Sequence, residues 1–319
     1  MKKLLLILCI LFSVVACKKE SKLQGDIAKI DVDFFVERFE KAFDDAKPED
    51  LPKLKEAFPF FFPERFNDSI WIEQMNDSLQ KELRYEVLKT FAEFKDVEQD
   101  IEQLFQHLKY YDRFFKEPRV VTLTNDVRYR EKVFVTDTIV LIALDNYLGK
   151  DHKFYGNIAG FLSQNFNRER IVVDLAEEYA KRYAYQATKR TLLDEMIYFG
   201  KLHYFKDAVV PFKSDAEKIG YTEEQLAWSE ANENEVWSYF VERELLFSTD
   251  SKLPSRFINP APFSKFYLEI DNESPGRLGQ YIGWQIVRKY MEDNDVELMD
   301  MMQKEAKEIF DNTKYKPRR

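Results

Sequence analysis

The stretch that decides the fold is Thr191-Leu192-Leu193-Asp194-Glu195-Met196-Ile197-Tyr198-Phe199-Gly200, in the second half of the chain. It lies inside residues 188–205, a run that contains no proline and is rich in apolar side chains. Proline would interrupt a helix, and a run of this length and composition predicts a largely buried one. Two acidic residues, Asp194 and Glu195, lie near its start, so the same helix contains candidates for both core packing and chemistry.

Further helices are predicted on both sides of this run. A polar residue, Asn67 or Asp68, is placed to cap one of them. Ser274 is placed to cap another, with Pro275 at its first position. Residues 97–115 give the strongest amphipathic pattern, with apolar residues recurring at helical spacing. The other predicted helices cover residues 33–46, 51–58, 171–185, 222–247 (one or two helices), 274–291 and 295–311.

Three short segments have the composition of strands. Residues 119–124 and 132–135 are rich in β-branched side chains, and residues 138–144 form a short apolar run typical of a buried strand. They predict a small sheet of three or four strands. No internal repeat or long linker divides the chain. We therefore expect a mainly α protein with a small β-sheet (α+β), organised as a single domain over residues 26–319.

The beginning of the chain has the layout of a lipoprotein signal peptide. Lys2 and Lys3 precede a dozen apolar residues, and Val14-Val15-Ala16-Cys17 places a small residue before a cysteine. The apolar run is shorter than the roughly 20 residues that span a bilayer. We expect cleavage after residue 16, acylation of Cys17 with fatty acids such as palmitate, and a polar tether over residues 17–25. The alternative is a short membrane anchor or a buried helix.

Composition limits the possible partners. The net charge is −9, which argues against nucleic acid, since its phosphates would repel the chain. Of two cysteines, Cys9 falls in the predicted signal peptide, so the mature chain has no pair for a disulfide. The chain has 28 Phe but only 9 Gly, which favours a Phe-rich helical core. Residues 58–63 (FPFFFP) are predicted to be mostly buried, and the basic C-terminal end is either a solvated tail or a docking peptide.

Most catalytic motifs are missing from the sequence. The three histidines, His107, His152 and His203, do not form the i, i+4 pair of a helical zinc site. There is no nucleophile elbow and no glycine-rich phosphate loop. Three glycines at residues 276, 279 and 283 recur at helical spacing, and they predict close helix packing rather than a phosphate site.

Residues 191–200 nevertheless have the apolar framing and length of the active-site helix of zinc metallopeptidases of the zincin type. Asp194 and Tyr198 occupy the two ligand positions and Glu195 the position of the base. Glu242 or Glu244 lies where the next helix would supply a third ligand, and we favour Glu242. The other interpretation is that these side chains are ordinary polar residues on helix faces.

The chain resembles the gliding-motility lipoprotein GldB family of Bacteroidetes-type bacteria, from the segment before Cys17 to the final helix. The stretches that carry this resemblance are residues 14–17, 31–34 (DVDF), 58–63 (FPFFFP), 136–149 (TDTIVLIALDNYLG), 192–201 (LLDEMIYFGK) and 274–284 (SPGRLGQYIGW). That family is similar in turn to predicted zinc proteases that have histidines where this chain has Asp194 and Tyr198.

The resemblance implies a degenerate zincin-like architecture and an inactive protein, with no catalytic residues, no metal and no cofactor. It implies a role in gliding motility and the linked secretion machinery, with other envelope proteins and the membrane as partners. The protein would be lipid-anchored in the cell envelope, facing the periplasm, with inner and outer membrane both open. Two alternatives remain: a metal-dependent peptidase that uses Asp194, Glu195 and Glu242, and an envelope scaffold without a motility role.

Overall fold

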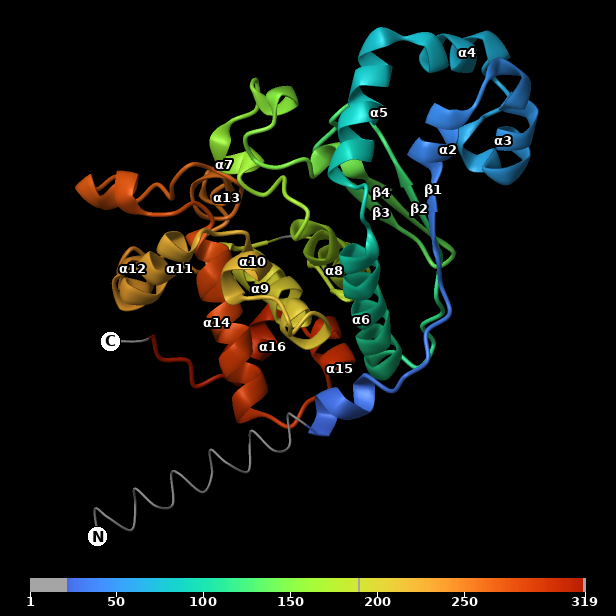
Figure 1. The fold of residues 1–319 in the computed structure, drawn as a ribbon. Helices are drawn as coiled ribbons and strands as arrows, with labels where there is room; N and C mark the ends of the chain where they lie inside the picture. Colours follow the sequence, from blue (N-terminus) through green and yellow to red (C-terminus); the bar gives the residue numbers. More distant parts are fainter. Residues whose placement is uncertain (1–21, 189, 318–319) are drawn as a thin grey trace.

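The computed structural model describes residues 22–188 and 190–317. The predicted signal peptide, Cys17, residues 17–21 of the tether, and Arg318 and Arg319 lie outside the described residues. A four-stranded sheet lies to one side of a larger body of helices (Figure 1). The structure is mostly helical with a small mixed sheet, so the predicted α+β class is confirmed. The zincin-like variant of that class stays a prediction.

The sheet contains the strands β1 (Val36–Arg38), β2 (Arg119–Leu123), β3 (Val133–Val135) and β4 (Ile139–Ala143), in the order β1-β2-β4-β3. The first three strands of that order are parallel, and β3 pairs with β4 in the antiparallel sense. Three strands lie where the sequence predicted them. The prediction of a helix over residues 33–46 was wrong in its first half, because residues 36–38 pair with β2 and only residues 39–45 are helical.

The two faces of the sheet contact different cores. Val120, Val140 and Ile142 belong to the large helical core, whereas Val121 belongs to a smaller cluster of aromatic residues. This alternation follows from the two-residue period of a strand. The smaller cluster lies under α2 (Phe39–Asp45), α3 (Leu51–Ala57) and α4 (Asp68–Asn76). Phe58 and Phe62 are buried there as predicted, while Phe60 is partly exposed.

The remaining helices form the larger body. Asn67 caps α4 through its side chain, in agreement with the sequence, and the predicted helix over residues 97–115 corresponds to α6. The helices are α5 (Ser78–Thr90), α6 (Lys95–Tyr111), α7 (Gly160–Ser163), α8 (Arg170–Tyr183), α9 (Leu192–Val209), α10 (Asp215–Ile219), α11 (Glu223–Ala231), α12 (Glu233–Glu242), α13 (Leu253–Phe257), α14 (Leu278–Asp293), α15 (Leu298–Gln303) and α16 (Ala306–Asp311). None of the described helices is long and apolar enough to cross a bilayer.

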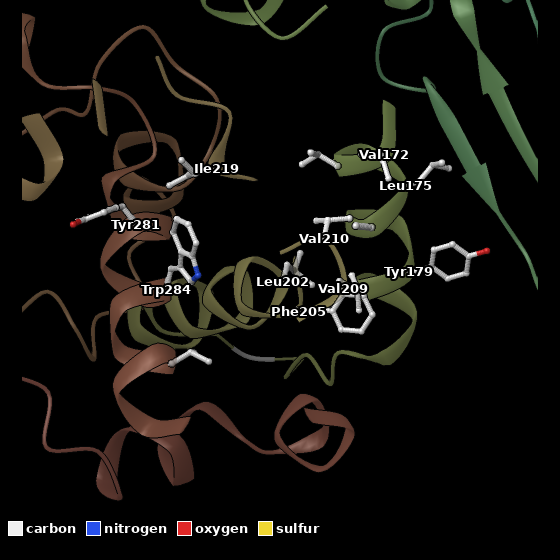
Figure 2. Close-up of a cluster of buried hydrophobic side chains, with 14 of the residues drawn as sticks. Val172, Leu175, Tyr179, Leu202, Phe205, Val209, Val210, Ile219, Tyr281 and Trp284 are labelled. Atoms are coloured by element: carbon white, nitrogen blue, oxygen red, sulfur yellow. The ribbon is translucent and has the colours of Figure 1, made fainter. Parts of the chain in front are cut away.

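The centre of the core is α9, which packs between α8 and α14 (Figure 2). Its side chains Leu202, Phe205 and Val209 are fully or almost fully buried. Figure 2 shows them between residues of α8 and of α14, with Trp284 on the α14 side. Burying an aliphatic or aromatic side chain contributes about 1.5–3 kcal/mol, so this three-helix contact is a main source of stability.

Glycines allow α9 and α14 to approach until their backbones touch. A Cβ added at Gly283 would lie 1.8 Å from the carbonyl oxygen of Met196, and one at Gly200 would lie 2.3 Å from the carbonyl oxygen of Gly283. Real Cβ atoms do not make such contacts, so only glycine fits at either position. The packing role predicted for Gly279 and Gly283 is confirmed.

Several predicted helix boundaries were wrong. The helix expected over residues 188–205 is α9, Leu192–Val209. The helix expected from Ser274 begins at Leu278, and the Ser274 hydroxyl instead donates to the backbone carbonyl of Asp271 at 2.8 Å, with that of Ser264 at 3.2 Å. Gly276 therefore precedes the helix and packs against Ala261. The single helix expected over residues 295–311 is two, α15 and α16, separated at residues 304 and 305.

Candidate functional site

Asp194, one of the two predicted ligand positions, is part of the cap of α9. Its Oδ2 accepts hydrogen bonds from the backbone N–H and the hydroxyl of Thr191, both at 2.7 Å. The Thr191 hydroxyl accepts in return from the backbone N–H of Asp194 at 3.2 Å. This reciprocal capping box satisfies donors that a helix start leaves free. The carboxylate of Asp194 thus has a structural role at the helix N-terminus.

Glu195 and Tyr198 follow Asp194 on α9. The Glu195 carboxylate pairs with Arg190 at 3.1 Å, and the Glu195 side chain is 13% exposed. Burial raises the pKa of Glu195, and the Arg190 guanidinium opposes this shift. Tyr198, whose pKa burial also raises, lines a cavity of about 220 Å³ together with Asp194 and Lys201. The structure therefore brings the two predicted ligand positions, Asp194 and Tyr198, to one cavity.

Glu242, the predicted third ligand, lies elsewhere. It is at the end of α12 and lines a different cavity of about 290 Å³, with Trp228, Tyr239, Phe266 and Leu268 among its neighbours. Within residues 22–188 and 190–317, no group of three or more His, Cys, Asp or Glu side chains is arranged to hold a metal ion. The predictions of no catalytic residue, no metal and no cofactor stay predictions.

Sequence reasoning missed two buried lysines on α9, Lys201 and Lys206. Lys201 is 2% exposed, and its ammonium donates to the carbonyls of Tyr185 (2.8 Å), Met302 (3.0 Å) and Lys304 (3.0 Å). Burial lowers the pKa of Lys201 to about 8. The available signal is its spacing, because Lys201 continues the i, i+4 stripe of Leu193 and Ile197, both of which are buried.

A charged cavity of about 230 Å³ lies where α8 meets the start of α14 and the β3 edge of the sheet. Aromatic rings and amide side chains line it together with charged groups. Five of its lining residues are basic and three are acidic, an excess of positive charge in a chain whose net charge is −9. The charged residues are Arg130, Lys132, Arg170, Lys181 and Arg277, and Asp174, Glu177 and Glu178.

The three carboxylates of the cavity already have cationic partners. Asp174 accepts hydrogen bonds from Lys132, from Arg170 at 2.9 Å and from the Tyr147 hydroxyl at 2.9 Å. Burial raises the pKa of Asp174, but the charges of Lys132 and Arg170 outweigh this effect and leave it below its usual value.

Glu177 and Glu178 are engaged in the same way. Glu177 pairs with the fully buried Lys206 at 3.1 Å and with Lys181 at 3.4 Å, and Glu178 pairs with Lys181 at 2.7 Å. Burial raises the pKa of Glu177, but Lys206 and Lys181 bring it well below the usual range. All three acids are therefore paired, and the excess positive charge remains on other side chains.

The sequence did not reveal this cavity. Its charged residues come from three separate parts of the chain, residues 130–132, 170–181 and 277, and only the fold brings them together. The spacing of Arg170 and Asp174, one helical turn apart, predicts at most a helix ion pair. No local pattern indicates that Arg277 reaches the same place.

These observations define a class: a helix-rich α+β protein with a charged cavity beside α8, an apolar groove along α12, and a central helix whose acidic residues cap it and form ion pairs. The family described as "Gliding motility protein GldB" matches residues 20–317, so the chain belongs to this family and has a role in gliding motility. The predicted resemblance is confirmed. Comparisons with curated proteins and with solved structures gave no significant match. Similarity to zinc proteases stays a prediction.

Proposed function

We propose that this protein is a lipid-anchored, non-catalytic component of the gliding machinery and its linked secretion apparatus, and that it acts by holding another envelope protein. The observation that carries this proposal is the groove along α12, which pairs apolar walls with carboxylates. Family membership supports the motility role, and the family's designation as a lipoprotein family supports a membrane-anchored envelope protein. Attachment through Cys17 and exposure to the periplasm belong to the same proposal.

The contacts of the acidic residues on α9 support the proposal that the protein acts without catalysis. A glutamate can act as a general base only within hydrogen-bond reach of a bound water or substrate. Glu195 pairs with Arg190, and Asp194 caps the helix. Glu242 lines another cavity, so the three carboxylates of the alternative metallopeptidase do not share one site. The observed contacts of Asp194 and Glu195 are a helix cap and an ion pair.

The groove has the features of a protein-docking surface. Trp228, Val236, Tyr239, Phe266 and Leu268 form its apolar walls. The Tyr239 hydroxyl donates to the carbonyl of Phe266 at 2.8 Å and holds the two walls together. Leu268 is half exposed, as large apolar residues at interfaces often are. Such a surface buries apolar side chains of a partner.

The charge of the groove narrows the choice of partner. Glu235 and Glu242 are exposed residues that line it, and no basic side chain does among the described residues. We therefore propose that the occupant is a partner segment with apolar side chains flanked by lysine or arginine. Complementary charge of this kind increases the association rate and the specificity more than the affinity.

The test is complementation of a strain that lacks the gene, with the full-length chain carrying either Leu268→Asp or Glu242→Lys. Both substitutions oppose the proposed contact, so we expect the affinity for the partner to fall at least about tenfold, the effect of roughly 1.4 kcal/mol of binding, and colony spreading to fall with it. Glu195→Gln should spread normally. Cys17→Ser should lose both palmitate labelling and spreading.

The matched control is Glu64→Lys, which reverses the charge of an exposed residue far from α12 in the sequence. It should spread like the unchanged protein, at equal amounts in the membrane fraction. Normal spreading of both groove variants together with loss of spreading in Glu195→Gln would overturn the proposal. That result would favour the hydrolase alternative.

A further inference from the structure

The charged cavity beside α8 contains an arginine that lacks a carboxylate partner. The Arg277 side chain donates one hydrogen bond, from Nη2 to the carbonyl of Gly220 at 2.9 Å, and its guanidinium lies 5.3 Å from the centre of the Tyr221 ring. Among the described residues, no carboxylate oxygen lies within 4.0 Å of it. A partly buried guanidinium without a carboxylate in direct contact is able to gain from an anion.

The backbone of Arg277 is itself strained. Its φ is +64°, in the left-handed region that arginine rarely adopts, at the residue immediately before α14. Such a conformation costs of order 1–3 kcal/mol and tends to be kept where a site requires it. In this case the conformation accompanies a guanidinium that lines the cavity instead of extending into solvent.

Arg170 approaches the same point from α8. Its Nη1 lies 3.3 Å from the position that a Cβ would take at Gly220, the residue whose carbonyl accepts from Arg277. The two guanidinium groups therefore meet at Gly220. Arg170 is 7% exposed, and its Nη2 donates to Asp174 at 2.9 Å and its Nη1 to the carbonyl of Glu217. Arg170 therefore adds positive charge beside Arg277, whose side chain donates a single hydrogen bond among the described residues.

We propose that this cavity binds the oxyanion group, carboxylate or phosphate, of a small organic ligand, which Arg277 holds and the positive charge of Arg170 attracts. Arginine is suited to this task, because its planar fork can donate two parallel hydrogen bonds to either group. The rings of Tyr129, Phe161 and Phe166 line the rest of the cavity and can contact the organic part of the ligand. The charges of the three carboxylates Asp174, Glu177 and Glu178 are offset by the cations that pair with them, Lys132, Arg170, Lys181 and Lys206.

The experiment is thermal unfolding of the full-length mature protein in detergent, titrated with sodium phosphate or sodium succinate against sodium chloride at equal ionic strength. We expect at least one of the two anions to raise the melting temperature, by roughly 3 °C for each tenfold increase in free anion above its dissociation constant. A response to phosphate alone would indicate a phosphorylated ligand, and a response to succinate alone a carboxylate.

Two variants of Arg277 make the test specific. Arg277→Gln removes the charge, and Arg277→Gly in addition suits the left-handed backbone, so at least one should fold. Both should lose the response to the anion. Arg113→Gln, which changes an exposed arginine whose guanidinium lies 4.7 Å from the centre of the Phe114 ring, should keep it. The proposal is overturned if neither anion exceeds chloride, or if a folded Arg277 variant responds as the unchanged protein does.

Discussion

The two buried lysines of α9 have their ammonium groups accommodated in different ways. Lys201 and Lys206 are five residues apart on one helix, and they are 2% and 0% exposed. The Lys201 ammonium donates to the carbonyls of Met302 in α15 and Lys304 just after it, and to that of Tyr185, which follows α8. Lys206 points to α8, where it contacts the Glu177 carboxylate at 3.1 Å and the Lys218 carbonyl at 2.7 Å.

The two lysines differ in the charge of the groups that accept from them. Burial lowers the pKa of both lysines to about 8, and Glu177 opposes the shift only at Lys206. At Lys201 the acceptors are neutral backbone carbonyls. Loss of the lysine therefore leaves these three carbonyls without one hydrogen-bond donor each. The Lys206 region uses a charged acceptor, Glu177, whose side chain is 30% exposed. Loss of the lysine there leaves a partly buried carboxylate with one of its two cations, which costs more than a carbonyl that loses one donor.

The largest effect is expected from breaking the helix contact that supports both regions. In Gly283→Ala, the new Cβ would lie 1.8 Å from the carbonyl oxygen of Met196, and neither backbone can move without separating α9 from α14. We expect a loss of more than about 4 kcal/mol, enough to abolish folding of a marginally stable protein. The measurement is the yield of soluble protein and its urea unfolding curve.

Gly160→Ala is the control, because a Cβ at Gly160 meets nothing within 4 Å. It should change the free energy of unfolding by less than about 1 kcal/mol. If Gly283→Ala folds with ordinary stability, the backbones of α9 and α14 do not touch as described.

The second largest effect is expected from replacing Lys206, whose acceptor Glu177 is charged. Lys206→Met leaves the partly buried Glu177, 30% exposed, with Lys181 as its remaining partner, and we expect a loss of about 3 kcal/mol, the lower end for a broken buried pair. Adding Glu177→Gln should restore part of that stability, because the unpaired charge is gone. Urea unfolding of both single variants and the double variant gives the coupling energy. A coupling near zero would mean that Lys206 and Glu177 do not act as a pair.

Sequence patterns predicted the parts of this fold that depend on local chemistry. The β-branched runs gave β2, β3 and β4, and helical spacing gave α6 and the packing role of Gly283. Strand β1 was missed because Phe35, Phe39 and Phe43 repeat at helical spacing, whereas pairing with β2 decides its conformation. Phe35 is in fact 72% exposed, so it does not belong to an apolar helix face.

The candidate sites were less predictable, because they depend on which segments the fold brings together. Asp194 and Tyr198 share a cavity, as their spacing on one helix predicted. Glu242 lies in another cavity because α12 places it there, which spacing along the chain cannot reveal. Arg277 was hidden in a different way. The Ser274-Pro275 pair predicted an ordinary helix start, and nothing local indicates a left-handed arginine three residues later.

The smallest effect at neutral pH, and the most diagnostic one, is expected from Lys201→Met. The three carbonyls that accept from Lys201 would lose that donor, and we expect a loss of about 1–3 kcal/mol at pH 7. The loss should grow at alkaline pH. The folded protein releases the Lys201 proton near its pKa of about 8, whereas an unfolded lysine keeps its proton up to about pH 10.4.

Between these two pKa values the unfolded chain binds more protons, so the stability that Lys201 contributes rises with pH and is greatest above about 10.4. Urea unfolding of the unchanged protein and of Lys201→Met at pH 7, 9 and 10 should therefore give curves that diverge. Lys81→Met, at an exposed lysine, is the matched control and should follow the unchanged protein at every pH. Parallel curves for Lys201→Met would mean that its ammonium keeps its proton inside the fold. Three carbonyls would then be enough to keep the buried ammonium charged. The two lysines would differ only in how much stability each substitution removes.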